Sequence, residues 1–135
     1  MPRRRRRSDC PINFAVETFG DRWTLLVLRD LLLKGRSSYS EFLRAEEHIA
    51  TNILADRLQR LQEDGLATRG ADGRYRPSAK ALDLLPVLVE MILWSATHDQ
   101  GTAAPAEFVE RARHDRDSLV AELRSSCTTV QTQTP

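Results

Sequence analysis

Apolar residues recur with a helical period in the stretch 49–66. Leu54, Leu58 and Leu61 fall at positions i, i+4 and i+7, so they share one face of a helix and need a core to pack against. Gly65 follows them, and glycine is the usual residue in the left-handed conformation that ends a helix. The pattern therefore predicts one amphipathic helix whose opposite face carries short and polar side chains.

Three further helices are predicted before this one. The first begins at Pro11, a residue favoured in the first turn, and ends at Gly20. The second is capped by Asp21 and ends at Gly35. The third starts at the segment 38–41, Ser-Tyr-Ser-Glu, which has the spacing of a capping box. A short helix joined by a brief polar turn to an amphipathic helix is the organisation of a helix-turn-helix.

A β-hairpin is predicted directly after the amphipathic helix. Two short extended runs in the stretch 66–77 surround Asp72-Gly73, a dipeptide favoured in tight hairpin turns. A hairpin at this place would be the wing of a winged helix-turn-helix, and its arginines would lie against phosphates or in a minor groove. The alternative is a solvated turn that carries a few charges.

The C-terminal half contains two apolar patterns. The stretch 78–98 predicts a long helix that is apolar on more than one face, with a kink or interruption near Pro86. So apolar a surface implies a partner, most simply a second copy related by two-fold symmetry. The stretch 106–123 predicts a further helix with one apolar stripe. That stripe consists of Phe108, Ala112, Leu119 and Leu123.

These patterns predict a mainly α fold with a small β-hairpin wing. We expect a flexible basic arm over residues 1–9 and a winged helix-turn-helix domain with dimerisation helices over 10–100. An accessory helix over 101–126 and a disordered tail over 127–135 complete the expected organisation.

Composition and charge add one feature to this picture. The chain has 135 residues, 41% hydrophobic and 29% charged, as is ordinary for a soluble globular protein with one modest core. The net charge of +1 does not by itself indicate a nucleic-acid partner. However, Arg3 to Arg7 form an unbroken basic block. Such a block is either simply solvated or, beside a DNA-binding surface, adds phosphate or minor-groove contacts.

Several classes of protein are disfavoured. Two cysteines and three histidines show neither a disulfide framework nor zinc-ligand spacing, so we expect no metal and no cofactor. We find no signal peptide, and the most apolar windows are too short or too charged to span a bilayer, so we expect a cytoplasmic protein. There is no nucleophile with a matching base, no paired carboxylates and no glycine-rich phosphate loop, so we do not expect an enzyme.

The order of the motifs resembles that of a known family. The segments CPINFAVETFGDRW, YSEFLR, IATNILADRLQRLQEDGL and LLPVLVEMILW, within residues 10 to 95, resemble those of HxlR-type bacterial winged helix-turn-helix regulators. The resemblance implies a homodimer formed by the N-terminal and long C-terminal helices. It also implies that each subunit places the second helix of its helix-turn-helix in the major groove of a near-palindromic operator, and we expect a repressor.

Candidate DNA contacts fall into two groups. Asn and Gln can pair with adenine, and the methyl groups of Thr and Ala can contact thymine, so the polar face of the amphipathic helix is expected to meet base edges. The predicted base-contacting residues are Thr51, Asn52, Ala55, Asp56 and Gln59. Arginines are better suited to phosphates, which set register rather than sequence preference. The predicted phosphate-contacting residues are Arg57, Arg60, Arg69, Arg74 and Arg76.

Two kinds of signal are candidates for control of binding. Cys10 stands where some family members carry a redox-active cysteine, and a helix N-terminus favours the reactive thiolate. The alternative is an unreactive thiol. A small-molecule effector is the second candidate, in a pocket formed by aromatic and apolar side chains that could equally be plain core. The predicted pocket residues are Phe14, Trp23, Met91 and Trp94.

A protein of a different class is also compatible with the sequence. A winged fold could serve as a protein–protein interaction module whose apolar helices bind another protein and whose DNA face is idle. Basic residues on both the arm and the hairpin argue against this alternative, because they are the features expected of a surface that follows phosphates.

Overall fold

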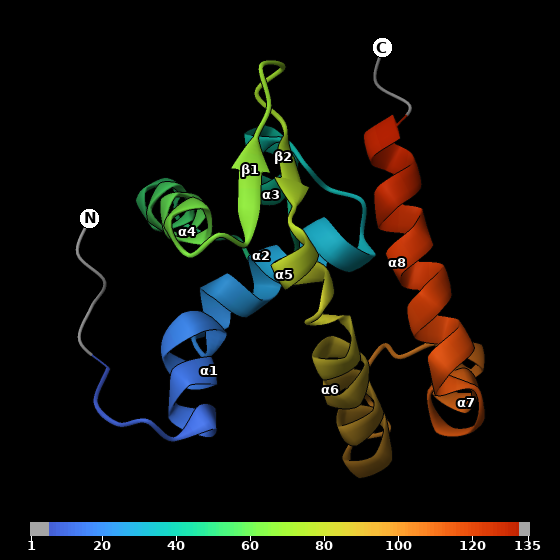
Figure 1. Cartoon of the computed structure of the whole chain (residues 1–135). Helices are drawn as coiled ribbons and strands as arrows, with labels where there is room; N and C mark the ends of the chain where they lie inside the picture. Colours follow the sequence, from blue (N-terminus) through green and yellow to red (C-terminus); the bar gives the residue numbers. More distant parts are fainter. Residues whose placement is uncertain (1–5, 133–135) are drawn as a thin grey trace. The chain divides into compact units, whose positions relative to one another are not determined.

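The computed structural model describes residues 6–132, with side chains as far as residue 128. Eight helices and two strands occur in this range (Figure 1). In order they are α1 Pro11–Phe19, α2 Arg22–Leu33, α3 Tyr39–Leu43, α4 Thr51–Glu63, β1 Ala67–Arg69, β2 Tyr75–Pro77, α5 Ala79–Leu82, α6 Leu85–His98, α7 Ala106–His114 and α8 Arg116–Thr132. The chain forms two compact units, one up to Ala79 and the other from Lys80.

The helix boundaries of the first unit lie where the capping residues predict them. Asp21 accepts hydrogen bonds from the backbone N–H groups of Trp23 and Thr24, both at 3.1 Å, and so caps α2. Gly35 follows α2 with a φ of 66°, a left-handed conformation that favours glycine. Ser38 and Glu41 form the predicted capping box at the start of α3. All three features are confirmed.

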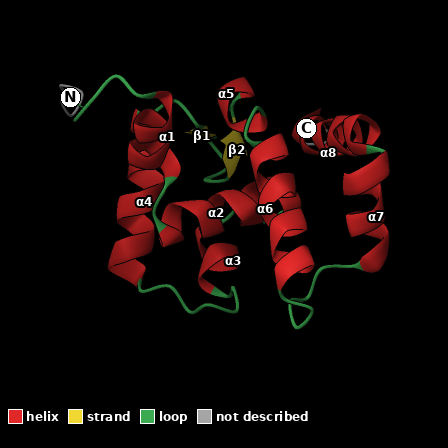
Figure 2. Cartoon of the chain, turned by 90° about the horizontal axis from the view of Figure 1, so that it is seen from below, coloured by secondary structure: helices red, strands yellow, loops and turns green. Residues whose placement is uncertain are grey.

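The helix-turn-helix consists of α3, the turn 44–50 and α4. Leu54, Leu58 and Leu61 are fully buried, as their spacing predicts, and α4 packs against α2 and α3 (Figure 2). Gly65 has a φ of 72° and ends the helix, after which the N–H of Leu66 donates to the carbonyl of Leu61 at 2.8 Å. The leucine face therefore anchors α4 in the core, and its other face remains outside.

The hairpin is also as predicted. Strands β1 and β2 pair antiparallel, with Thr68 opposite Arg76, and Gly73 adopts a φ of 80° in the turn. The N–H of Tyr75 donates to the carbonyl of Ser37 at 2.8 Å, so the wing is also hydrogen-bonded to the loop between α2 and α3. The buried Tyr75 ring meets Phe42 edge-on at 6.2 Å between ring centroids. These contacts fix the base of the wing.

In contrast to these buried helices, α1 has no fully buried residue. Two of its apolar side chains are exposed, Ile12 to 75% and Val16 to 58%, whereas Phe14, Ala15 and Phe19 are partly buried. An apolar helix face of this kind is a feature of a surface that meets a partner.

The second unit begins at the predicted interruption. α5 ends at Leu82, and α6 starts three residues later, at Leu85, with Pro86 in its first turn. Proline lacks the N–H that a continuous helix would need at this position and its ring would clash with the preceding turn, so the helix restarts there. The kink or interruption near Pro86 is confirmed.

The prediction of a single helix after residue 105 is wrong, because two helices, α7 and α8, occupy this stretch. Asp115 adopts a φ of −146° and its carbonyl accepts from the N–H of Leu119 at 3.1 Å, so it caps a new helix instead of continuing the old one. The apolar stripe nevertheless forms a core against α6. Its members are Phe108, Ala112, Leu119 and Leu123, which pack with Val89.

The end of the chain also differs from the prediction. Disorder was expected from residue 127, but α8 continues as far as Thr132. Extending a helix that is already held by a core needs only one residue to be ordered for each new hydrogen bond, so even a polar, threonine-rich segment can follow it. Residues 133–135 and the first five residues, which include most of the arginine block, lie outside the described residues.

Candidate nucleic-acid interface

The outer face of α4 carries all five residues predicted to contact bases. Each is solvent-exposed, whereas the leucines of the same helix are buried. The five residues are Thr51, Asn52, Ala55, Asp56 and Gln59. The amide of Gln59 donates to Glu63 at 3.2 Å, one turn further along the helix. This exposed bond can exchange with other partners, so Gln59 is free to turn toward a ligand.

The start of α4 is held by a residue that the sequence prediction did not include. The hydroxyl of Tyr39 donates to the carbonyl of Thr51 at 3.1 Å and so joins the first turn of α3 to the first turn of α4. Arg44, at the end of α3, is exposed and donates to the carbonyl of Ser40 at 3.3 Å. The capping box identified the start of α3, but nothing in the spacing indicated that the Tyr39 hydroxyl would bond to the first turn of α4.

The two arginines of α4 differ in their surroundings. The side chain of Arg57 is only 20% exposed; its Nε donates to Asp21 at 3.0 Å, and a second nitrogen donates to the neighbouring Asp56. The side chain of Arg60 is 35% exposed and lies 4.0 Å from Asp56. Burial by itself raises the pKa of Asp21, but hydrogen bonds from Thr24 and Arg57 lower that pKa to about 2. Arg57 is therefore engaged within the protein to a greater extent than Arg60.

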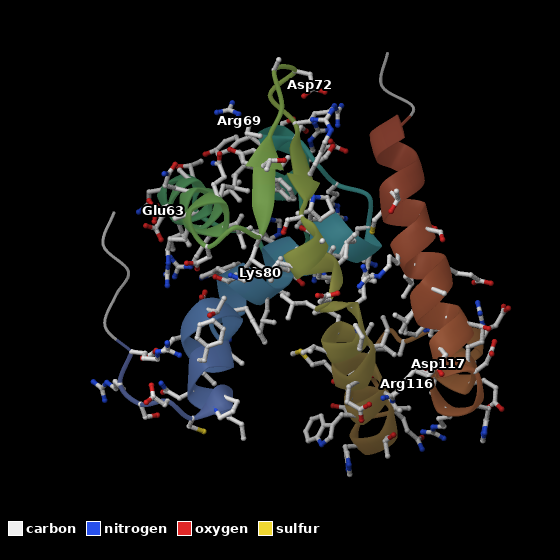
Figure 3. The ribbon with its side chains drawn as sticks, in the orientation of Figure 1. Glu63, Arg69, Asp72, Lys80, Arg116 and Asp117 are labelled. Atoms are coloured by element: carbon white, nitrogen blue, oxygen red, sulfur yellow. The ribbon has the colours of Figure 1, made fainter. Side chains whose placement is uncertain are left out.

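The wing arginines likewise differ in their partners. Figure 3 shows Arg69 and Asp72 toward the outer end of the hairpin. Among the described residues no carboxylate pairs with Arg69, whose guanidinium lies 5.6 Å from the centre of the Tyr75 ring. Arg74 donates to Glu41 at 2.8 Å, and Arg76 donates to Asp72 at 2.8 Å. The hydrogen bond from Arg76 lowers the pKa of Asp72 to about 2. Arg69 is thus the wing arginine best prepared to meet a phosphate.

A buried ionic cluster supports the turn of the helix-turn-helix. Asp30 is 2% exposed, and its Oδ1 accepts from Arg29 at 2.8 Å and from Arg36 at 2.7 Å. Arg29 also binds Glu47 at 2.6 Å, and Arg36 binds Glu46 at 3.3 Å. Both glutamates belong to the turn before α4. The sequence analysis did not predict this cluster; the signal that could have indicated it is the pair Arg29-Asp30 inside an otherwise apolar run, because buried charges need partners.

The candidate redox residue lies at the start of α1. Cys10 is exposed, and its carbonyl accepts from the N–H of Phe14 at 3.0 Å, in the first turn of the helix. Of the arginine block, Arg6 and Arg7 are described, and the Arg6 guanidinium lies 5.7 Å from the centre of the Phe14 ring. The other cysteine, Cys127, is partly buried, and burial raises the pKa of its thiol. A role for Cys10 in redox sensing stays a prediction.

The residues of the predicted ligand pocket lie in different units. Met91 and Trp94 line an open apolar groove of about 630 Å³ along α6, and the ion pair of Glu90 with Arg116 borders it. Trp23 lines a separate, much smaller hollow beside α2 and α3 in the first unit. A common pocket that also includes Phe14 stays a prediction. Within residues 6–132 there is no cluster of three or more residues suited to a metal, and no helix long and apolar enough to cross a membrane.

Comparisons with known proteins agree with this architecture. The model of the HxlR-like helix-turn-helix family matches residues 18–102. An HTH-type transcriptional regulator of Synechocystis, the uncharacterised sll1512, is 31% identical over 88 residues, which cover 61% of this chain and 64% of that relative. The crystal structure of PA1607, a candidate transcription factor, is similar with a TM-score of 0.62 and 31% identity, over 70% of this chain and 68% of the other. The chain thus spans slightly less than two thirds of the curated relative.

Proposed function

Because the chain belongs to the HxlR-like helix-turn-helix family, we propose that it is a transcriptional regulator that binds double-stranded DNA as a homodimer. The operator is near-palindromic, and the protein represses transcription when it is bound there. Each subunit inserts α4 into a major groove and lays its wing along the adjacent backbone. Two such helices meet half-sites about one helical turn apart, roughly 34 Å.

The observation that supports this proposal most strongly is the division of α4 into two faces. The leucine face is buried, and the opposite face presents exposed Thr, Asn, Ala, Asp and Gln side chains with no apolar residue larger than alanine among them. Side chains of this kind fit the donor and acceptor pattern of base edges. Arg60 at one border of the face and Arg69 on the wing would meet phosphates, with Arg74 and Arg76 able to join them by exchanging their present carboxylate partners.

The apolar faces of two helices support the homodimer. Ile12 and Val16 are exposed on α1, and Val87, Met91 and Trp94 are exposed on α6. Exposed apolar side chains that lie together on a helix mark an interaction surface. In a two-fold dimer the same patch of each subunit meets its counterpart, which would place the two α4 helices in symmetric positions.

Selection of bound duplexes from random DNA by the purified protein tests the proposal. We expect enrichment of a near-palindrome and a steep fall of affinity with salt, since several phosphates are neutralised. Gln59→Ala should reduce discrimination at one base pair by roughly 1–3 kcal/mol, whereas Arg69→Gln should weaken binding to all sequences about equally. A selection that enriches no sequence would refute the proposed function.

The interaction module remains the second candidate, and one observation favours it. Two of the three wing arginines, Arg74 and Arg76, are already neutralised by carboxylates. Arginines that stabilise the wing through ion pairs within the protein do not need a DNA backbone as their partner. The salt dependence separates the two functions, because an idle DNA face gives neither tight binding nor sequence preference.

The signal that controls binding is either an oxidant at Cys10 or a small apolar molecule. The exposure of Cys10 supports the first, and the groove beside Met91 and Trp94 supports the second. Mass spectrometry after mild peroxide, with DNA binding measured in parallel, tests the thiol; Cys10→Ser is the control. Thermal shifts with quinones, aldehydes and aromatic acids test the groove, and a flat response across the panel would exclude it.

A further inference from the structure

One ion pair joins the proposed recognition helix to the start of α2. Asp21 is the N-cap of α2, and its Oδ1 accepts from the backbone N–H groups of Trp23 and Thr24. Its Oδ2 accepts from the Thr24 hydroxyl at 2.5 Å. The Nε of Arg57, which lies 36 residues further along the chain, donates to the same Oδ1 at 3.0 Å. The carboxylate that receives Arg57 is therefore held in place by three bonds of its own helix.

Arg57 stands at the border between the two faces of α4. It neighbours the buried Leu58 on one side and the exposed Asp56 on the other, and it donates to the carboxylates of both Asp56 and Asp21. With two acids beside it and one fifth of its side chain exposed, Arg57 has little charge or surface left for a phosphate. Arg60, one turn further on, has a single carboxylate neighbour at 4.0 Å and is more exposed.

A contact of this kind restricts the rotation of α4 about its own axis. Each residue turns the helix by about 100°, so a small rotation carries every side chain of the outer face away from its base edge. Leucine side chains in a core tolerate such shifts better than polar groups that need accurate hydrogen-bond geometry. The leucine core alone therefore does not fix the rotation of α4 accurately. A side chain on α4 that is bonded to a fixed carboxylate at the start of α2 restrains this rotation.

We propose that Asp21 and Arg57 form a positioning pair that sets the rotation of α4 and thereby the sequence preference of the protein, and that Arg57 does not contact phosphate. This inference rests on the proposed DNA-binding function. The sequence analysis predicts that Arg57 contacts phosphate, and the proposed positioning role replaces that prediction. It also gives Asp21 a second role beyond capping α2.

Variants can separate the pair from the cap. Asp21→Asn keeps a good N-cap residue but removes the charge that binds Arg57. Arg57→Gln removes the other partner, and Arg60→Gln is the matched control, because it makes the same change one turn away on the same helix. Each protein is titrated with the duplex that wild type selects and with a shuffled duplex, at several salt concentrations. Circular dichroism and urea unfolding confirm that each variant is folded under the binding conditions.

A positioning pair predicts the following pattern. Asp21→Asn and Arg57→Gln each reduce the affinity ratio between selected and shuffled duplex by about tenfold, the size of one lost base contact. The double variant loses no more than either single variant, since both remove the same contact. The dependence on salt is unchanged. Arg60→Gln instead weakens both duplexes equally and lowers the salt slope by about one.

Other outcomes would overturn the inference. If Arg57→Gln weakens both duplexes equally and lowers the salt slope while Asp21→Asn behaves as wild type, Arg57 is a phosphate contact. Arg57→Lys gives a second test that does not depend on the folding of Asp21→Asn. This variant keeps the positive charge but loses the bond from Nε. If Arg57 is a positioning residue, the variant loses discrimination between the two duplexes; if Arg57 contacts phosphate, discrimination is unchanged. If the wild-type protein itself prefers no sequence, the proposed function fails. That result differs from the two outcomes that assign Arg57 a positioning role or a phosphate role.

Discussion

The buried carboxylate of Asp30 allows a quantitative prediction about the helix-turn-helix. Its Oδ1 accepts three bonds: from the Nε of Arg29 at 3.0 Å, from a second nitrogen of Arg29 at 2.8 Å, and from Arg36 at 2.7 Å. Through these arginines it is linked to Glu46 and Glu47 in the turn before α4. Asp30→Asn removes the charge and nearly preserves the shape, so it isolates the ionic contribution.

The expected cost follows from these contacts. Charge-assisted hydrogen bonds contribute about 1.5–3 kcal/mol each, and removing one partner of a buried ion pair costs about 3–5 kcal/mol. The three bonds are not additive, because they share one oxygen atom and the asparagine oxygen still accepts at least one of them. The side chains of Arg29 and Arg36 are also 20% and 23% exposed and keep their glutamate partners. We therefore expect Asp30→Asn to reduce the free energy of unfolding by about 2–4 kcal/mol.

Urea unfolding followed by circular dichroism measures this loss. Asp56→Asn is the matched control, because Asp56 also has two arginine neighbours, Arg57 and Arg60, but its side chain is 55% exposed. An exposed pair contributes about 1 kcal/mol or less, so the control should lie near wild type. Equal and small losses for both variants would show that the cluster does not stabilise the fold, and the reasoning from burial would then be wrong.

Three other predictions concern the first unit. Leu58→Ala should reduce the free energy of unfolding by about 2–5 kcal/mol, because Leu58 is fully buried; a loss below about 1 kcal/mol in urea would contradict its place in the core. Gly65→Ala should cost about 1–2 kcal/mol in the same assay, because the residue has a φ of 72° that a Cβ disfavours; an unchanged midpoint would mean that the helix can end in another way. The pKa of Asp21 is lowered to about 2, so its contribution to stability is present above its usual value of 3.8 and is lost as the pH falls through 2. Asp21→Asn should therefore flatten the decline of the urea midpoint between pH 4 and 2, and a decline as steep as that of wild type would refute this linkage.

Predictions from short-range signals were largely accurate. Capping residues, Pro86 and the three left-handed glycines act within a few residues of their own position, so the boundaries of α2, α3 and α4 and the turn of the wing followed from the sequence. The leucine period of α4 depends only on helical geometry, and it correctly separated the buried from the exposed face. One error, the prediction of a single helix across Asp115, occurred because this aspartate stands among many other charged residues, so that the sequence did not single it out as a helix cap.

Partners that are distant along the chain could not be predicted in this way. The residue types on the outer face of α4 and on the wing, and the family order of the motifs, could be read from the sequence alone. The folded structure was needed to show that Arg57 binds Asp21, that Arg74 binds Glu41, and that Arg69 has no acidic partner among the described residues. An arginine side chain is long enough to reach any of several carboxylates. Its partner therefore depends on which carboxylate the packing of the core places close to it.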